Sequence, residues 1–267
     1  MKVKLFLKRF YLAVILIFMY LPIGALIVFS FNESKSMAKW TGFSLHWYEQ
    51  LLQDPSIAEA VWVTVSIAMI ASLSATFIGT LAAVGMDNFR KKSKNIMVNF
   101  TYIPMVNAEI VTGISLLLLF IFFNIPRGYW TMLLAHITFD IPFVIFSVLP
   151  KLRQMDPGTY EAALDMGARP AYAVRKVILP QIAPGIVTGF LLAFTMSFDD
   201  FMISFFTSQG ATQNLSTYIY SMARVGINPM INALSAIMFI VVIMLLLVIN
   251  LRSVKRTKKM PRVGSFR

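Results

Sequence analysis

Four carboxylates stand within long apolar stretches of the sequence: Glu109, Asp140, Asp199 and Asp200. An ionised side chain at the centre of a membrane helix costs about 2.5–3.5 kcal/mol on insertion scales, so such groups normally face a bundle interior or a watery cavity. No Lys or Arg stands in the same stretches to pair with them. The compensating cation is therefore expected from a partner chain or from a positively charged substrate.

The acidic pair at positions 199 and 200 is the strongest candidate for contact with such a cation. Phe198 and Phe201 flank the pair, and an aromatic face can add about 0.5–2 kcal/mol to cation binding. Adjacent positions on a helix differ by about 100°, so Asp199 and Asp200 cannot point in the same direction. We expect one to line a substrate path and the other to cap a helix or bond a neighbour.

The other two acids have alternative, structural roles. Glu109 follows Pro104, where the helix is expected to be irregular, and it either lines the path or marks that irregularity. Asp140 precedes Pro142 and either lines the path or caps the segment after a kink. His136 stands one turn before Asp140, and we predict a hydrogen-bonded pair of these two side chains rather than a metal site.

The sequence contains none of the motifs that carry catalysis or nucleotide binding. A phosphate-binding loop, a nucleophile elbow, an H-E-x-x-H metal site and a dinucleotide fingerprint are all absent. There are no cysteines, and the two histidines, His46 and His136, are too far apart for a zinc-protease site. We therefore predict no catalytic residue, no metal and no ATPase site in this chain, and a membrane enzyme is the weakest function class.

The composition indicates that these apolar stretches are membrane spans. Of the 267 residues, 58% are hydrophobic and 13% charged, with a mean hydropathy of +0.72, whereas soluble domains have about 45–50% apolar and about 25% charged residues. The chain is therefore predicted to be an all-α, multi-pass membrane protein with a single domain, 1–267. A span needs about 20 apolar residues, and six are predicted: 10–31, 60–85, 98–123, 130–149, 186–206 and 233–251.

The distribution of cations predicts the orientation of these spans. Twenty of the 24 Lys and Arg residues lie before the first span, between the second and third, between the fourth and fifth, or after the sixth. The other side holds only Lys35, Lys39, Arg127 and Arg224. Because cytoplasmic loops are enriched in cations, both termini are predicted to be cytoplasmic. The net charge of +12 is thus a topology signal and an attraction to anionic membrane lipid, not an indication of nucleic-acid binding.

The longest predicted inner loop, 150–185, has the local signals of two short helices separated by a break. Asp156 is a suitable N-cap before Pro157, which suits the first helical position. Gly167 can adopt the left-handed conformation that ends a helix. A second helix is expected to begin at Pro170.

Two further prolines, Pro180 and Pro184, are expected to end or kink the second helix before the fifth span. The result would be a rigid helical hairpin that projects into the cytoplasm. Its role is open at this point: it either docks onto a partner protein or pads the bilayer surface.

One series of residues in this loop has a recognisable spacing: Glu161-Ala162-Ala163, then Gly167, then Leu179-Pro180. The series resembles the EAA loop of the permease subunits of ATP-binding-cassette importers, with Val177 as a conservative departure from the usual Ile. The resemblance covers almost the whole chain and implies the type I importer permease fold with six spans. It also implies that these six residues belong to a coupling helix that docks into a groove on an ATP-binding subunit.

Three longer stretches carry a finer resemblance: TMSFDDFMISFFTSQG (195–210), TYIYSMARVGINPMINALSAI (217–237) and NAEIVTGISLLLLFIFF (107–123). They resemble the polyamine branch of these permeases, of the PotC type in spermidine/putrescine importers. A polyamine carries two or more ammonium groups and suits spaced carboxylates. Our candidates for the substrate path are Asp199, Asp200, Glu109, Phe198, Phe201 and Asp140, of which Asp140 lies outside the family pattern.

The resemblance also implies partners and a location. The chain would form half of a translocation path together with a second homologous permease, either a copy or a relative, with a heterodimer favoured over a homodimer. An ATP-binding subunit dimer would hold ATP and Mg, and an extracytoplasmic substrate-binding protein would deliver the polyamine to a bacterial cytoplasmic (inner) membrane. The alternatives are an importer permease for another small solute, or a stand-alone carrier or channel for organic cations, which would leave the hairpin without a role.

Overall fold

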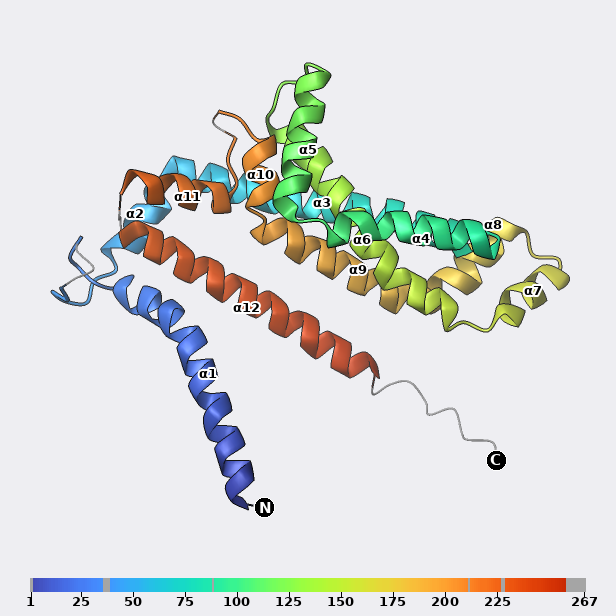
Figure 1. Cartoon of the computed structure of the whole chain (residues 1–267), viewed down its shortest axis with the longest axis horizontal. Helices are drawn as coiled ribbons and strands as arrows, with labels where there is room; N and C mark the ends of the chain where they lie inside the picture. Colours follow the sequence, from blue (N-terminus) through green and yellow to red (C-terminus); the bar gives the residue numbers. More distant parts are fainter. Residues whose placement is uncertain (1, 36–38, 88, 211, 227–228, 258–267) are drawn as a thin grey trace. The chain divides into compact units, whose positions relative to one another are not determined.

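The computed structural model describes residues 2–35, 39–87, 89–210, 212–226 and 229–257, and it is built from helices and their connections (Figure 1). The chain divides into two compact units, which are described separately: Met1–Ala58 with Tyr218–Arg267, and Glu59–Thr217. Within the described ranges, β pairing is confined to an isolated bridge between Asn32 and Phe43. The all-α prediction therefore holds for this part of the chain.

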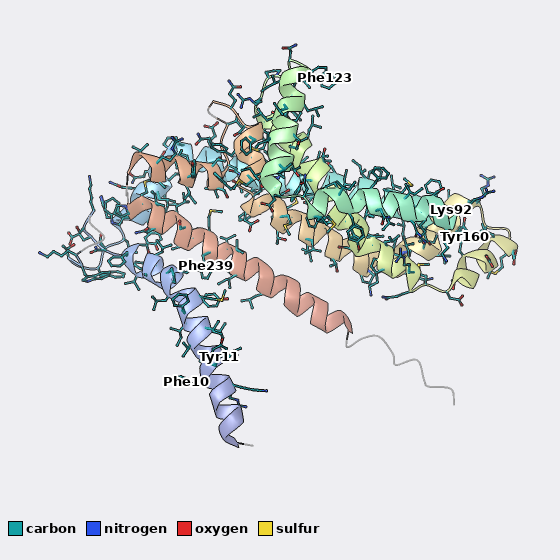
Figure 2. All side chains as sticks on the ribbon, in the orientation of Figure 1. Phe10, Tyr11, Lys92, Phe123, Tyr160 and Phe239 are labelled. Atoms are coloured by element: carbon teal, nitrogen blue, oxygen red, sulfur yellow. The ribbon has the colours of Figure 1, made fainter. Side chains whose placement is uncertain are left out.

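The first unit is built on two long helices, α1 (Lys2–Phe29) and α12 (Pro229–Thr257), with the short α2 (His46–Gln53) and most of α11 (Leu215–Val225). Helix α12 packs against α1 and α2. Many side chains of α1 point outward, as Phe10 and Tyr11 do in Figure 2, with 62% and 68% of their surfaces exposed. An apolar surface of this kind suits contact with lipid tails.

A compact loop follows α1 in the same unit, and Asn32 organises it. The Asn32 side chain donates to the Lys39 carbonyl at 2.9 Å and accepts from the Thr41 N–H at 3.0 Å. The Trp47 indole N–H donates to the Asn32 carbonyl at 2.7 Å. Phe31 stacks on Phe43 with 5.2 Å between the ring centroids. These contacts hold the described part of the loop against the start of α2.

The second unit contains most of α3 (Pro55–Asp87), then α4 (Lys91–Val106), α5 (Glu109–Phe122), α6 (Tyr129–Arg153), α9 (Leu179–Asp199) and α10 (Met202–Thr207). Helices α6 and α9 lie side by side (Figure 1). Two glycines of α9 permit this approach, because a Cβ at Gly185 would lie 2.8 Å from the Ser147 carbonyl oxygen and one at Gly189 would lie 3.1 Å from the Val144 Cα. Val144 and Val148 are fully buried in the core.

Four helices among the described residues are long and apolar enough to cross a membrane: Lys8–Phe29, Pro55–Asp87, Tyr129–Arg153 and Pro170–Asp199. The first three contain the predicted spans 60–85 and 130–149 and nearly all of 10–31. The predicted span 233–251 lies within α12. The tail cations Lys258, Lys259, Arg262 and Arg267 lie outside the described residues.

The predicted span 98–123 is broken into two helices, at the irregularity expected between Pro104 and Glu109. Helices α4 and α5 meet at an angle of 100°, with Asn107 and Ala108 in extended conformations between them. Pro104 removes one backbone donor from the last turn of α4. Contact with α10 holds α5 in its direction, because a Cβ at Gly113 would lie 2.8 Å from the Phe206 ring.

The helix that carries the predicted span 186–206 begins before this span, whereas the predicted end at residue 206 is wrong. The helix begins earlier, because α8 (Pro170–Ala173), a π turn (Val174–Ile178) and α9 are continuous. Pro180 directly follows the π turn, and Pro184 lies inside α9, so neither proline ends the helix before the fifth span. At the other end the helix stops at Asp199, and α10 starts at Met202.

Candidate functional site

The hairpin between α6 and α9 forms as the sequence predicts. Helix α7 (Pro157–Asp165) begins after Asp156, whose carboxylate accepts the N–H of Gly158 at 2.9 Å. Gly167 has a φ of +86°, and its N–H donates to the Leu164 carbonyl. The N–H of Ala168 donates to the Ala163 carbonyl, which completes the hydrogen-bond pattern of a glycine-terminated helix.

The residues of the EAA series point in two directions. Ala163 is buried, and the neighbouring Tyr160 and Leu179 pack against the core formed by α6 and α9. Glu161 and Ala162 are exposed, and Met166, between them and the glycine turn, exposes 83% of its surface. Gly167 and Pro180 are also exposed. The hairpin is thus anchored on one side and presents an acidic, partly apolar surface on the other.

The adjacent aspartates at the end of α9 have different surroundings. Asp199 is exposed. Asp200 is buried, and its two carboxylate oxygens accept the N–H groups of Ile203 at 3.2 Å and Ser204 at 2.8 Å. Asp200 is therefore the member of the pair that caps a helix, α10, and Asp199 is the member that remains accessible.

Glu109 lies at the first turn of α5, next to the break after α4, and its side chain is exposed. Because α5 packs against α10, Glu109 comes within electrostatic range of both Asp199 and Asp200. Phe201 is partly buried, whereas Phe198 is buried and stacks on Phe194 with 5.8 Å between centroids. The two helix breaks thus place exposed carboxylates of α5 and α9 within electrostatic range of each other.

Asp140 is fully buried in the middle of α6, which continues through Pro142. The predicted direct hydrogen bond between His136 and Asp140 is wrong. Ser197 of α9 lies between them: its hydroxyl group donates to Asp140 Oδ2 at 2.7 Å and is 3.0 Å from His136 Nδ1. Both α6 side chains face α9, and the serine hydroxyl fills the space between them.

Sequence reasoning missed three polar residues at this site: Ser197, Ser204 and Asn214. Ser204 Oγ lies 2.9 Å from His136 Nε2, and Asn214 Nδ2 donates to Ser204 Oγ at 2.8 Å. The two serines could have been recognised in the sequence as small polar residues beside an acidic pair in an otherwise apolar stretch. Within the described ranges, no group of three or more His, Cys, Asp or Glu side chains could hold a metal ion.

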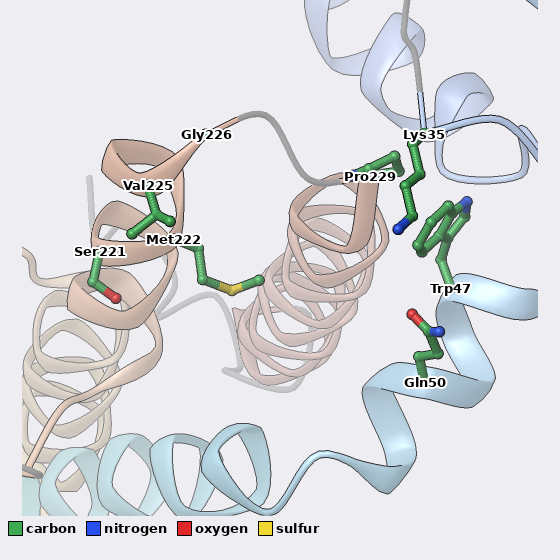
Figure 3. Close-up of a pocket in the computed structure, with 8 residues that line it drawn as sticks. All are labelled: Lys35, Trp47, Gln50, Ser221, Met222, Val225, Gly226 and Pro229. Atoms are coloured by element: carbon green, nitrogen blue, oxygen red, sulfur yellow. The ribbon is translucent and has the colours of Figure 1, made fainter.

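The first unit contains a separate cavity of about 560 Å³ (Figure 3). Lys35, Trp47 and Gln50 line it from the loop after α1 and from α2, and residues of α11 and α12 such as Met222 and Pro229 complete it. Nearby, the Tyr218 hydroxyl group donates to Asp54 Oδ2 at 3.3 Å. Burial and the neighbouring Asp54 carboxylate raise the pKa of Tyr218.

Comparison with known proteins decides the family. Residues 75–258 match the family described as binding-protein-dependent transport system inner membrane component. The chain belongs to this family. The matched range includes the hairpin and all four acids.

Two curated relatives and one solved structure are similar to this chain. It is 36% identical to the spermidine/putrescine transport system permease protein PotC of Haemophilus influenzae, over 89% of this chain and 92% of that one. It is 38% identical to the putrescine transport system permease protein PotI of Escherichia coli K12, over 82% and 81%. A chain of a bacterial ABC transporter that imports the acidic polysaccharide alginate has the same fold, with a TM-score of 0.75, 13% identity and coverage of 93% and 96%.

Proposed function

We propose that this chain is the polyamine permease subunit of an ATP-driven importer and forms half of its membrane path. The observation that carries the proposal is that two exposed carboxylates, Asp199 and Glu109, lie within electrostatic range of each other at two helix breaks. Both stand in stretches without Lys or Arg, 177–223 and 95–126. The similarity to polyamine permeases supports the same substrate class. A carboxylate–ammonium contact at 4 Å contributes about 1–4 kcal/mol, depending on the local dielectric.

The six candidate residues of the path fall into two groups, accessible and buried, which have different roles. Asp199 and Glu109 contact the ammonium groups, and Phe201 lies beside them. Asp200 positions the corner between α9 and α10 through its contacts with backbone N–H groups. Asp140 and Phe198 are buried behind this surface and support it from within the second unit.

The hairpin couples the permease to an ATP-binding subunit, which carries ATP and Mg. Its exposed face contains Glu161, Ala162 and Met166. The glycine turn at Gly167 and the buried Ala163 hold this face in a fixed conformation, which lowers the entropic cost of docking.

The membrane arrangement has six spans with both termini in the cytoplasm. The four long apolar helices provide four spans, the bent pair α4 and α5 a fifth, and α12 the sixth. The distribution of cations supports this orientation. The complete transporter contains a second, different permease, an ATP-binding dimer and an extracytoplasmic binding protein in a bacterial inner membrane.

The decisive experiment is substrate-stimulated ATP hydrolysis and labelled-polyamine uptake by the complete transporter in liposomes. The parent should respond to spermidine or putrescine, and Asp199→Asn and Glu109→Gln should reduce uptake by about tenfold, the loss of about 1.4 kcal/mol. Glu59→Gln, an exposed acid of α3, is the control. A response to an unrelated solute alone, or uptake by the single chain without an ATPase, would replace the proposal with one of the two transport alternatives.

A further inference from the structure

A hydrogen-bonded group of buried polar side chains in the second unit has no part in docking or in direct contact with the substrate. It joins α6, α9, α10 and the segment before α11, and each member has at most 2% of its surface exposed. Figure 1 shows α6, α9 and α10 converging at this place. We call this group the His136 relay: Asp140, Ser197, His136, Ser204 and Asn214.

The direction of the hydrogen bonds begins at Asn214. The backbone N–H of Thr217 donates to Asn214 Oδ1 at 2.9 Å, which identifies the oxygen of this amide. The Asn214 nitrogen therefore faces Ser204 Oγ at 2.8 Å and donates to it. The hydroxyl proton of Ser204 is then available to His136 Nε2 at 2.9 Å.

The bond from Ser197 to Asp140 fixes the tautomer of the imidazole when Asp140 is ionised. Because the Ser197 hydrogen is directed at Asp140 Oδ2, Ser197 Oγ accepts from His136 Nδ1–H at 3.0 Å, and Nε2 is left to accept from Ser204 at 2.9 Å. Ser197 in turn donates to Asp140 Oδ2 at 2.7 Å. Every donor between Asn214 and Asp140 thus has an acceptor when His136 is neutral and Asp140 is ionised.

The charge of this arrangement is not balanced by side chains of the same helices. Asp140 and Asp200 are both buried, and Asp140 Oδ1 has no hydrogen-bond partner. The sequence has no Lys or Arg between residues 128 and 150 or between 177 and 223. Burying carboxylates is costly unless a cation pairs with them, and a proton is the cation that these groups can bind themselves.

The geometry provides a route for one proton. His136 Nε2 lies 3.5 Å from Asp200 Oδ2, so a proton bound at Nε2 faces this carboxylate. The proton on Nδ1 then passes to Ser197 as the Ser197 proton passes to Asp140 Oδ2. The relay ends with a neutral Nε2–H imidazole and a protonated Asp140. One proton has been gained, and the charge of the two carboxylates and the imidazole changes from two negative to one negative.

We propose that the His136 relay is a binding site for one transferable proton, held between Asp200 and Asp140. The titratable groups that face it are these two carboxylates, with Asp199 and Glu109 within electrostatic range of Asp200. If the proposed polyamine path is correct, a substrate ammonium at Asp199 and the relay proton repel each other. Each then weakens the binding of the other by the same factor.

The first test measures the proton directly and does not depend on the substrate. The chain has two histidines. The full-length His46→Gln variant with ¹⁵N-labelled histidine in lipid nanodiscs therefore contains one labelled imidazole, and the signals of its two ring nitrogens report the tautomer. We expect the neutral Nδ1–H form at alkaline pH and a protonated or Nε2–H form on acidification across about pH 5 to 8, where imidazoles titrate. An Nε2–H form at alkaline pH, or an unchanged signal across this range, would overturn the proposal.

Two variants test the acceptor of the proton and the bridge that leads to it. Asp140→Asn keeps the shape of the side chain but cannot store the proton, so the Nε2–H form should disappear. Ser197→Ala breaks the bridge and should have the same effect, whereas Ser115→Ala, which removes a hydroxyl bonded within its own helix, should leave the titration unchanged. An unchanged titration in Asp140→Asn would contradict storage of the proton at Asp140. This variant alone is sufficient for the test if Ser197→Ala does not fold.

The second test measures transport by the complete importer as a function of pH. We expect the KM for spermidine to rise about fivefold on acidification in the parent, within the usual range of coupling between sites, and to stay constant in Asp140→Asn. A parental pH dependence in Asp140→Asn would show that the relay proton is not linked to substrate. A normal ¹⁵N titration without any polyamine transport would support the proton site and reject the proposed substrate.

Discussion

Asp199 and Asp200 are neighbours in the sequence with different tasks. The end of α9 falls between them, so the Asp199 side chain stays exposed while Asp200 turns inward and accepts two backbone N–H groups of α10. Such N-cap contacts stabilise a protein by about 0.5–2 kcal/mol. A helix end at this position therefore separates one accessible carboxylate, the proposed substrate contact, from one with a structural role.

The first prediction compares these two residues. Asp199→Asn should fold like the parent and slow polyamine uptake by about tenfold. The loss should be greater for a triamine than for a diamine, because more charges lose a partner. Asp200→Asn should lower the stability of the purified protein, since a weaker acceptor replaces the carboxylate cap. Uptake normalised to inserted protein, together with thermal unfolding in detergent, distinguishes the two, and equal behaviour of both variants would refute this division of roles.

At the scale of helices, close approach depends on glycine at particular positions. Gly185 of α9 lies against α6, where a Cβ would be 2.8 Å from a backbone oxygen and from Lys151 Cγ. Gly85 of α3 has no described neighbour within 4 Å of its Cβ position. The two glycines therefore provide a matched pair.

The second prediction uses this pair. Gly185→Ala should destabilise the protein by about 1–3 kcal/mol because the helices must move apart. Gly85→Ala should leave its stability unchanged or raise it by about 0.5–1 kcal/mol, the helix preference of Ala over Gly. Denaturant titration of the purified chain in micelles provides the measurement. Tolerance of both alanines would contradict the tight contact between α6 and α9.

The third prediction concerns the α7 hairpin as an element. Gly167→Pro removes an N–H that bonds Leu164 and cannot adopt a φ of +86°, so the exposed face should lose its conformation. Glu161→Lys reverses the charge of that face, and Glu161→Gln only removes it. Membrane insertion should persist in all three, while co-purification of the ATP-binding subunit should fall most in the first two. Parental association and uptake in Gly167→Pro and Glu161→Lys would reject the coupling role.

At the scale of the whole molecule, the family of this chain is described as the inner membrane component of a binding-protein-dependent transport system. The proposed importer contains further chains, and its function would depend on how this chain is placed in the membrane beside them.

The fourth prediction tests the membrane topology. A reporter inserted after Lys92 should be cytoplasmic, and one inserted near Lys39 should be external, because cations accumulate on the cytoplasmic side. Enzyme activity or labelling of the reporter on intact cells gives the location. An external reporter at Lys92 would exclude the six-span arrangement.

The sequence by itself determined the class of protein and the positions of most helices. Long apolar stretches require helices because a bilayer offers no partner for free backbone groups, which is why 60–85 and 130–149 are found within α3 and α6. Local chemistry also predicted the hairpin, since the Asp156 cap and the left-handed Gly167 depend on neighbours in the chain. The EAA series identified the family for the same reason, as a local pattern.

Only the tertiary structure decided where the helices break and which acids are accessible. Apolar stretches continue on both sides of Asn107 and of Asp200, so hydropathy averaged over a span does not reveal either break. The direction of α5 depends on Gly113 meeting α10, and the fate of Asp200 depends on Ser204 and His136. These are contacts between residues far apart along the chain, and the periodicity of a single helix carries no information about its neighbour.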